Sequence, residues 1–166
     1  NQDSTQFSFT VDSDKPESTF VTPGDDAIVN DENQTVDVSL TSSSDSRSIN
    51  DSEVSLTIEG DTTDYSESFA NTDDEYTNDT NTFSVNPSAE GVEYFADDTY
   101  AVTVSGENDI GNSFTDTYSV EVDTTGPEVT NVGLSNDGLN EDSENPVVTV
   151  NFSEEVDTSE VSANVV

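Results

Sequence analysis

The stretch DDTYAVTVSGENDIGNSFTDTYSVEVDTTGP, residues 97–127, carries the pattern that decides the fold of this chain. Every second residue of YAVTV (100–104) is apolar, and the same is true of YSVEV (118–122), which follows the turn-rich segment ENDIGN. Alternation with a period of two is typical of strands that bury one face and expose the other. The stretch therefore predicts two consecutive strands joined by a hairpin turn.

The rest of the chain repeats this signal in shorter runs. VDVSL (36–40) and VSLTI (54–58) alternate in the same way, and no stretch of eleven or more residues shows the apolar stripe of a helix. Segments rich in Gly, Pro, Asp and Ser separate the runs. We predict strands at about 17–21, 34–41, 53–59, 64–69, 81–85, 99–105 and 114–122. About seven short strands in one domain indicate an all-β immunoglobulin-like sandwich.

An internal repeat sets the predicted domain organisation. FSFTVDSDKPESTFV (7–21) aligns with YSVEVDTTGPEVTNV (118–132) at an offset of 111, and VDVSL (36–40) aligns with VTVNF (148–152) at an offset of 112. Such self-similarity is typical of tandem arrays, so we expect tandem immunoglobulin-like β-sandwiches. We expect residues 1–14 to be the last strand of a preceding unit with its linker. Residues 15–123 would form a complete unit, and 124–166 a linker and the first strands of a following unit.

The charge balance indicates an unusual solvent. The chain has 38 acidic residues against Lys15 and Arg47 alone, which gives a formal net charge of −36. Such a chain repels itself in dilute buffer, whereas at about 1 M salt the Debye length falls to about 3 Å and most of the repulsion is screened. We therefore expect a folded protein adapted to hypersaline water. Nucleic acids and anionic membrane surfaces are disfavoured as partners.

Two stretches resemble known cell-surface repeats. The strand-turn-strand segment 97–127, with its D-x-Y-x-V-x-V strand, D-x-x-G-N turn and D-T-T-x-P linker, resembles the closing hairpin of bacterial and archaeal immunoglobulin-like surface repeats. PVVTVNFSEEVDTSEV (146–161) resembles the opening of another immunoglobulin-like family that occurs in S-layer proteins. Together with the acidity, the resemblance points to S-layer glycoproteins of halophilic archaea. It implies an extracellular structural protein at the cell surface, which assembles with copies of itself and carries N-linked glycans.

One residue of this stretch resembles a hallmark of the same folds. Tyr100 stands near the start of the sixth predicted strand, the place of the tyrosine corner in immunoglobulin-like domains. An ordinary buried Tyr would fit the alternation equally well. The Cys and Trp residues of antibody domains are absent, so the chain is not an antibody-type unit.

The composition argues against an enzyme. The sequence contains no His, no Cys and a single Lys, so most arrangements of a nucleophile and a base are excluded. Paired carboxylates occur, but in so acidic a chain they carry no information about catalysis. We assign no catalytic residue.

Acidic residues near the predicted ends of the units are candidates for a calcium site. Calcium takes oxygen ligands from carboxylates, carbonyls and water, and it would stiffen a joint by bridging acidic groups. The candidate residues are Asp12 and Asp123 at one repeat position, Glu107 and Asp109 in the closing hairpin turn, and Asp25 and Asp137 after the first strand of each unit. The alternative is that these residues are ordinary surface acids of a halophilic protein.

Four N-x-S/T sequons are candidates for glycosylation. They begin at Asn33, Asn50, Asn78 and Asn151. The chain is so rich in Asn, Ser and Thr that chance alone predicts about as many. Asn151 alternates with Val150 and Phe152, which are expected to face inward, so its side chain is predicted to face solvent.

Two other functions fit the same sequence. The chain could be the stalk of a cell-surface adhesin, or a non-catalytic spacer or carbohydrate-binding module of a secreted hydrolase. Exposed aromatic residues on one face would favour a carbohydrate-binding module, but the alternation places Tyr100 and Tyr118 inside. The pattern leaves Phe20, Tyr76 and Phe95 unplaced. The sequence contains no recognisable signal peptide and no membrane-spanning segment.

Overall fold

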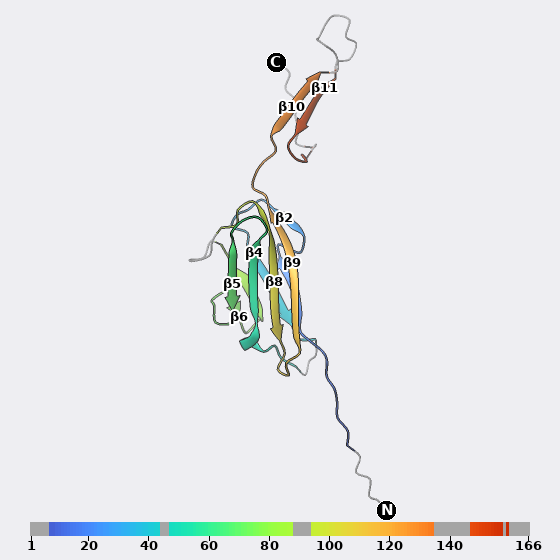
Figure 1. The fold of residues 1–166 in the computed structure, drawn as a ribbon, viewed down its shortest axis with the longest axis vertical. Coiled ribbons are helices and arrows are strands. Elements are labelled where there is room, and N and C mark those ends of the chain that lie inside the picture. The colour runs from blue at the N-terminus through green and yellow to red at the C-terminus, as the bar shows by residue number, and fades with distance from the viewer. Residues whose placement is uncertain (1–6, 44–46, 88–93, 135–146, 158, 160–166) are drawn as a thin grey trace, which may run out of the picture. The chain divides into compact units, whose positions relative to one another are not determined.

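The chain is an all-β protein. A computed structural model describes residues 7–43, 47–87, 94–134, 147–157 and 159, which form eleven strands and one short 3₁₀ segment, Asp51–Glu53. The chain divides into two compact units, residues 1–124 and 125–166, which are described separately below (Figure 1). In the described part of the chain, no helix is long and apolar enough to cross a membrane.

Two sheets make up the first unit. The four-stranded sheet has the order β1-β3-β7-β6. The five-stranded sheet has the order β2-β9-β8-β4-β5, and its strands are labelled in Figure 1. The first sheet contains β1 (Glu17–Thr22), β3 (Val36–Thr41), β6 (Tyr76–Thr77) and β7 (Thr82–Val85). The second contains β2 (Ala27–Val29), β4 (Ser55–Gly60), β5 (Ser66–Ala70), β8 (Asp98–Glu107) and β9 (Ser113–Val122). Neighbouring strands are antiparallel except β2 and β9, which are parallel.

The seven strands predicted from alternation correspond to β1, β3, β4, β5, β7, β8 and β9. Two further strands of the first unit were not predicted, because β2 has three residues and β6 has two, which is too short for alternation to be visible. The 3₁₀ segment occupies residues 51–53, so β4 begins two residues later than expected.

A single apolar core joins the two sheets. Val36 and Val38 of the four-stranded sheet and Leu56, Val102 and Val104 of the five-stranded sheet are all fully buried in one cluster. This is the arrangement of a β-sandwich, in which the two inner faces interdigitate. The three aromatic residues that alternation could not place, Phe20, Tyr76 and Phe95, are also buried in this cluster.

Tyr100 joins β8 to the loop in front of it. Its ring is fully buried, and its hydroxyl donates a hydrogen bond to the carbonyl of Ala96, four residues upstream, at 3.0 Å. The Tyr100 hydroxyl therefore makes a hydrogen bond to the upstream backbone, which an ordinary buried Tyr need not make. Burial raises the pKa of the Tyr100 hydroxyl, so it remains a donor at neutral pH.

The second unit contains one antiparallel pair of strands, β10 (Val129–Leu134) and β11 (Val148–Phe152). Val132 pairs with Val150, each 112 positions beyond Phe20 and Val38, which pair in the first unit. The two pairs therefore have the same register at an offset of 112 in both strands, whereas the sequence alignment of 7–21 has an offset of 111. The irregularity in the register of β10 between Val129 and Asn131 accounts for the one-residue difference.

The environments of these two equivalent pairs differ. Phe20 and Val38 are at most 7% exposed, whereas Val132 and Val150 are 60% and 41% exposed. In the first unit the five-stranded sheet covers this apolar face, and in the described part of the second unit no sheet covers it. Asn151, on the opposite face of β11, is exposed as predicted, but Val150, which was expected to face inward, is exposed as well.

Candidate functional site

The turn between β8 and β9, residues 108–112, is organised by the side chain of Asn108. Its Oδ1 accepts hydrogen bonds from the backbone N–H groups of Ile110 at 3.2 Å and Asn112 at 2.9 Å. Asn often closes a turn in this way, because its short side-chain amide reaches the backbone N–H groups of the residues that follow it. Gly111 completes the turn with a φ of 86°, which few other residues adopt without strain. Asn108 is only 2% exposed, and the two hydrogen bonds from the turn hold its side-chain amide in one orientation.

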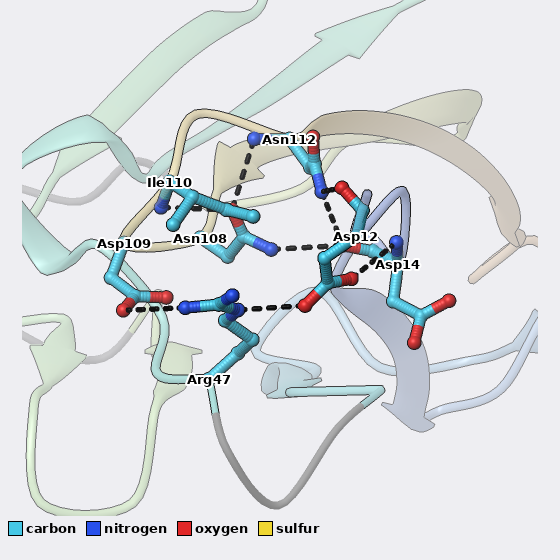
Figure 2. A network of polar contacts seen from close by, with 7 residues as sticks. All are labelled: Asp12, Asp14, Arg47, Asn108, Asp109, Ile110 and Asn112. Atoms are coloured by element: carbon cyan, nitrogen blue, oxygen red, sulfur yellow. Dashed lines mark hydrogen bonds and ion pairs between the residues drawn. The ribbon is translucent and has the colours of Figure 1, made fainter. Parts of the chain in front are cut away.

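The segment in front of β1 lies against this turn. The Nδ2 of Asn108 donates to the carbonyl of Asp14 at 2.8 Å. The Nδ2 of Asn112 donates to the same carbonyl at 2.8 Å and to the carbonyl of Asp12 at 3.2 Å. Two residues later Pro16 is buried, and β1 begins at Glu17. Two side-chain amides of the hairpin turn thus satisfy backbone carbonyls of a segment that has no regular secondary structure (Figure 2).

Arg47 adds a cationic side chain to this site. Its Nε lies 2.8 Å from Oδ2 of Asp12, and its Nη1 lies 3.7 Å from Oδ2 of Asp109 (Figure 2). The side chains of Arg47 and Asp12 are 28% and 20% exposed, so water and salt reach the pair. The hydrogen bond from Arg47 lowers the pKa of Asp12, and the N–H of Asp14, which donates to Oδ1 of Asp12 at 3.0 Å, lowers it further.

We call these contacts the amino-terminal network. It consists of Asp12, Asp14, Arg47, Asn108, Asp109 and Asn112. Its members come from the segment ahead of β1, the loop between β3 and β4, and the β8–β9 turn. The network contains donors and acceptors for a peptide backbone and two ion pairs of Arg47, and among its six residues no nucleophile is paired with a base. Its chemistry is that of holding a chain segment.

Three of the candidate calcium residues lie in or next to this network. Asp12 and Asp109 both face Arg47, so the cation between these two carboxylates is a guanidinium. Glu107 ends β8, and its Oε1 accepts a hydrogen bond from Nδ2 of Asn50 at 2.9 Å. Among the residues that the structure describes, no three acidic, His or Cys side chains gather closely enough to hold a metal ion.

The other candidate calcium residues lie elsewhere. Asp25 accepts a hydrogen bond from the backbone N–H of Ser119 in β9 at 2.9 Å. Asp123 follows the last residue of β9, and its N–H donates to the carbonyl of Val29 at 2.9 Å. Asp137 lies outside the described residues. Calcium binding by these residues stays a prediction.

Asp12 and Asp123 occupy opposite ends of the first unit, although they share a repeat position. Asp12 contacts Asn112, which directly precedes β9, and Asp123 directly follows β9. The ten residues of β9 span roughly 30 Å at about 3.3 Å per residue. At the far end, Oδ1 of Asp97 accepts hydrogen bonds from the N–H and the hydroxyl of Thr124 at 2.8 and 2.6 Å. The first unit therefore holds the chain where it arrives and where it leaves.

The four sequons differ in their surroundings. Asn50 is engaged on both sides of its amide, since Nδ2 donates to Glu107 and Oδ1 accepts from the hydroxyl of Ser52 at 2.7 Å. Asn78 lies in an exposed turn after β6, and Asn151 is exposed on β11. Asn33 is half-buried in the loop between β2 and β3. The side chains of Asn78 and Asn151 are therefore more accessible to a glycosylating enzyme than that of Asn50. Glycosylation of any of the four Asn residues stays a prediction.

Asn108 and Asn112 are the functional residues that sequence reasoning did not find. Both lie in ENDIGN, which the sequence identifies only as a turn. Two Asn residues four positions apart around a Gly are the one local signal that could have drawn attention to them. Comparisons of the chain with protein families, curated proteins and solved structures found no match.

Proposed function

We propose that the chain is part of an extracellular structural protein of a halophilic archaeon, in which immunoglobulin-like sandwiches follow one another in an S-layer or a surface filament. One observation carries the proposal. The chain arrives at the first unit beside the β8–β9 turn and leaves at the other end of β9, roughly 30 Å away. A unit connected in this way adds its own length to the chain, which is what a lattice or filament protein requires.

The strand orders support an immunoglobulin-like unit. Immunoglobulin domains have one sheet with strands in the order A-B-E-D and a second that contains C, F and G. In the first unit β1, β3, β7 and β6 follow the first order, and β4, β8 and β9 are consecutive neighbours in the second sheet. The hydroxyl of Tyr100, at the start of the F-like strand, makes the hydrogen bond of a tyrosine corner.

The second unit supports a tandem arrangement. Its two strands pair in the register of β1 and β3, with Val132 and Val150 at the places of Phe20 and Val38. A two-stranded hairpin with a bare apolar face is marginally stable in water. The hairpin therefore fits the opening of a further sandwich better than a free-standing element.

The surface chemistry supports the hypersaline, structural setting. A net charge of −36 needs molar salt to be screened, and the acidic side chains hold water and cations. In the described part of the first unit the mostly exposed aromatic side chains are Tyr94, at 59%, and Phe7 and Phe9, both at 87%, which precede the strands of the sandwich. A carbohydrate-binding module would need a row of exposed rings for sugars to stack on, so this alternative has little support.

The proposal includes the partners that the resemblance implies. Copies of the same protein would make the lattice or filament, and N-linked glycans would decorate exposed turns such as that of Asn78. Calcium bound by carboxylates at the ends of units would add stiffness to the array.

Electron microscopy of the native assembly tests the proposal. An antibody raised against this chain would be bound to intact cells kept in molar salt, with antibody absorbed on the purified chain as the control. We expect labelling of a two-dimensional lattice or of regular filaments. Labelling of isolated threads with no lateral contacts would replace the proposal by an adhesin stalk. Labelling confined to soluble particles would overturn it.

A further inference from the structure

The amino-terminal network is preformed on the side of the hairpin turn. Oδ1 of Asn108 is occupied by the N–H groups of Ile110 and Asn112, and this fixes the amide so that Nδ2 points away from the turn. The carbonyl of Asp14 takes the hydrogen bond that Nδ2 then offers. A buried amide with no acceptor would cost the free energy of an unmade hydrogen bond, so this position favours a hydrogen-bond acceptor, and the carbonyl of Asp14 supplies it.

The network holds the segment mainly through neutral groups. Three hydrogen bonds from the amides of Asn108 and Asn112 reach the carbonyls of Asp12 and Asp14. One ion pair, between Arg47 and Asp12, is partly exposed and is therefore weakened by salt. Neutral hydrogen bonds do not depend on the Debye length. The balance of contacts suits a protein that works in concentrated salt.

Little chain remains between the network and the sheet. After the carbonyl of Asp14 come Lys15 and Pro16, and β1 begins at Glu17. Pro fixes its own φ, restricts the residue before it, and is buried here. No hinge fits between Asp14 and β1, so any bending of the chain ahead of this unit occurs before Asp12.

We propose that the β8–β9 turn and Arg47 form a docking surface for the acidic segment that connects to the sandwich, and that this surface fixes the direction in which the chain arrives. The partner is an extended peptide that offers carbonyls at two alternate residues and a carboxylate at the first of them. The inference deepens the proposed function and rests on it only in treating this segment as a connection between units.

Distance measurements between two spin labels test the docking surface in the full chain. The sequence contains no Cys, so Ser13→Cys and Ala101→Cys supply the only two labelling sites. Ser13 is exposed and lies in the docked segment between Asp12 and Asp14, and Ala101 is exposed on the outer face of β8. We expect one narrow distance distribution in molar NaCl. A broad distribution for this doubly labelled parent chain would overturn the proposal.

Two matched pairs of variants, made in the labelled chain, separate the neutral contacts from the ion pair. Asn112→Asp removes the two hydrogen bonds that Nδ2 of Asn112 donates to the segment, and Asn78→Asp adds the same charge in an exposed turn away from the network. Arg47→Gln and Lys15→Gln each remove one of the two positive charges, but only Arg47 contacts Asp12. Far-UV circular dichroism would verify that each variant is folded.

The outcomes differ with salt. Asn112→Asp should lose the single narrow peak at both moderate and multimolar NaCl, and Asn78→Asp should keep it. Arg47→Gln should broaden the distribution at moderate salt and approach the parent chain in multimolar salt, and Lys15→Gln should change nothing.

An unchanged distribution for Asn112→Asp, or equal effects of Asn112→Asp and Asn78→Asp, would overturn the proposal. If Asn112→Asp does not fold, Arg47→Gln decides: equal effects of Arg47→Gln and Lys15→Gln at moderate salt would overturn it. Neither result depends on how copies of the protein assemble, so failure here is distinct from failure of the proposed function.

Discussion

Arg47 lies between two carboxylates that are far apart in the sequence, with its Nε 2.8 Å from Asp12 and its Nη1 3.7 Å from Asp109. In a chain with 38 acidic residues and two basic ones, one of the two positive charges is thus placed where the amino-terminal segment meets the hairpin turn. The position of this charge leads to the first prediction.

The contribution of the Arg47–Asp12 pair to stability should disappear in acid. The pKa of Asp12 is lowered in the folded protein from an ordinary value of 3.8. The pair therefore contributes fully above about pH 4, and its contribution is lost as the pH falls through the lowered pKa. Because protonation also relieves repulsion elsewhere, the quantity to measure is the difference in Tm between the natural chain and Asp12→Asn. We expect a small, constant difference at neutral pH that vanishes well below pH 4. A difference that persists unchanged in strong acid would contradict this assignment.

Tyr100→Phe should destabilise the first unit. The substitution keeps the buried ring and removes only the hydroxyl that donates to the carbonyl of Ala96. The loss should be about 1 kcal/mol in the free energy of unfolding, the usual contribution of such a hydrogen bond. Chemical denaturation in molar salt measures it, with Tyr94→Phe on the exposed Tyr94 as the control. Equal stability of the two variants would make Tyr100 a plain core residue.

Asp98→Asn should loosen the loop between β4 and β5. The two carboxylate oxygens of Asp98 accept hydrogen bonds from the N–H and hydroxyl groups of Thr62 and Thr63. Desolvation raises the pKa of Asp98, but these bonds, led by that from the Thr63 N–H, outweigh it and hold the pKa far below its usual range. An Asn amide accepts through one oxygen only. We expect faster hydrogen exchange at Thr62 and Thr63 and a lower Tm.

Asp61→Asn is the matched control for this variant. It removes the same charge from an exposed residue of the same loop. Because the pKa of Asp98 is lowered, its contribution should be complete above the ordinary pKa of Asp and should be lost only in strong acid. Similar exchange rates in Asp98→Asn and Asp61→Asn would show that charge alone matters at this loop.

Salt should stabilise the folded chain. A net charge of −36 destabilises the compact state in dilute buffer, and screening at molar salt removes most of this repulsion. The Tm should rise from low to molar NaCl or KCl, and an equally concentrated neutral osmolyte should raise it less. Equal Tm values at low and high salt would exclude adaptation to hypersaline water.

Much of the fold could be predicted because most of its strands can be recognised from a short stretch of sequence. In β4, β8 and β9 the alternation of apolar and polar residues is long enough to be read, since each strand buries one face. The burial of Phe20, Tyr76 and Phe95 could not be predicted, because these residues are buried by strands distant in sequence. The parallel pairing of Ala27–Val29 with β9 was invisible for the same reason.

The sequence by itself determined that the chain is all-β, where the seven longer strands of the first unit lie, and that its formal net charge is −36. These features depend on residue type and on periods of two residues, which a short window contains. Only the tertiary structure decided which acids meet Arg47, that Asn108 and Asn112 hold the carbonyls of Asp12 and Asp14, and that Asp12 and Asp123 lie at opposite ends of one unit. The physical reason is that these contacts join residues about 35 to 100 positions apart, and hydrogen bonds depend on distance and direction that no local pattern encodes.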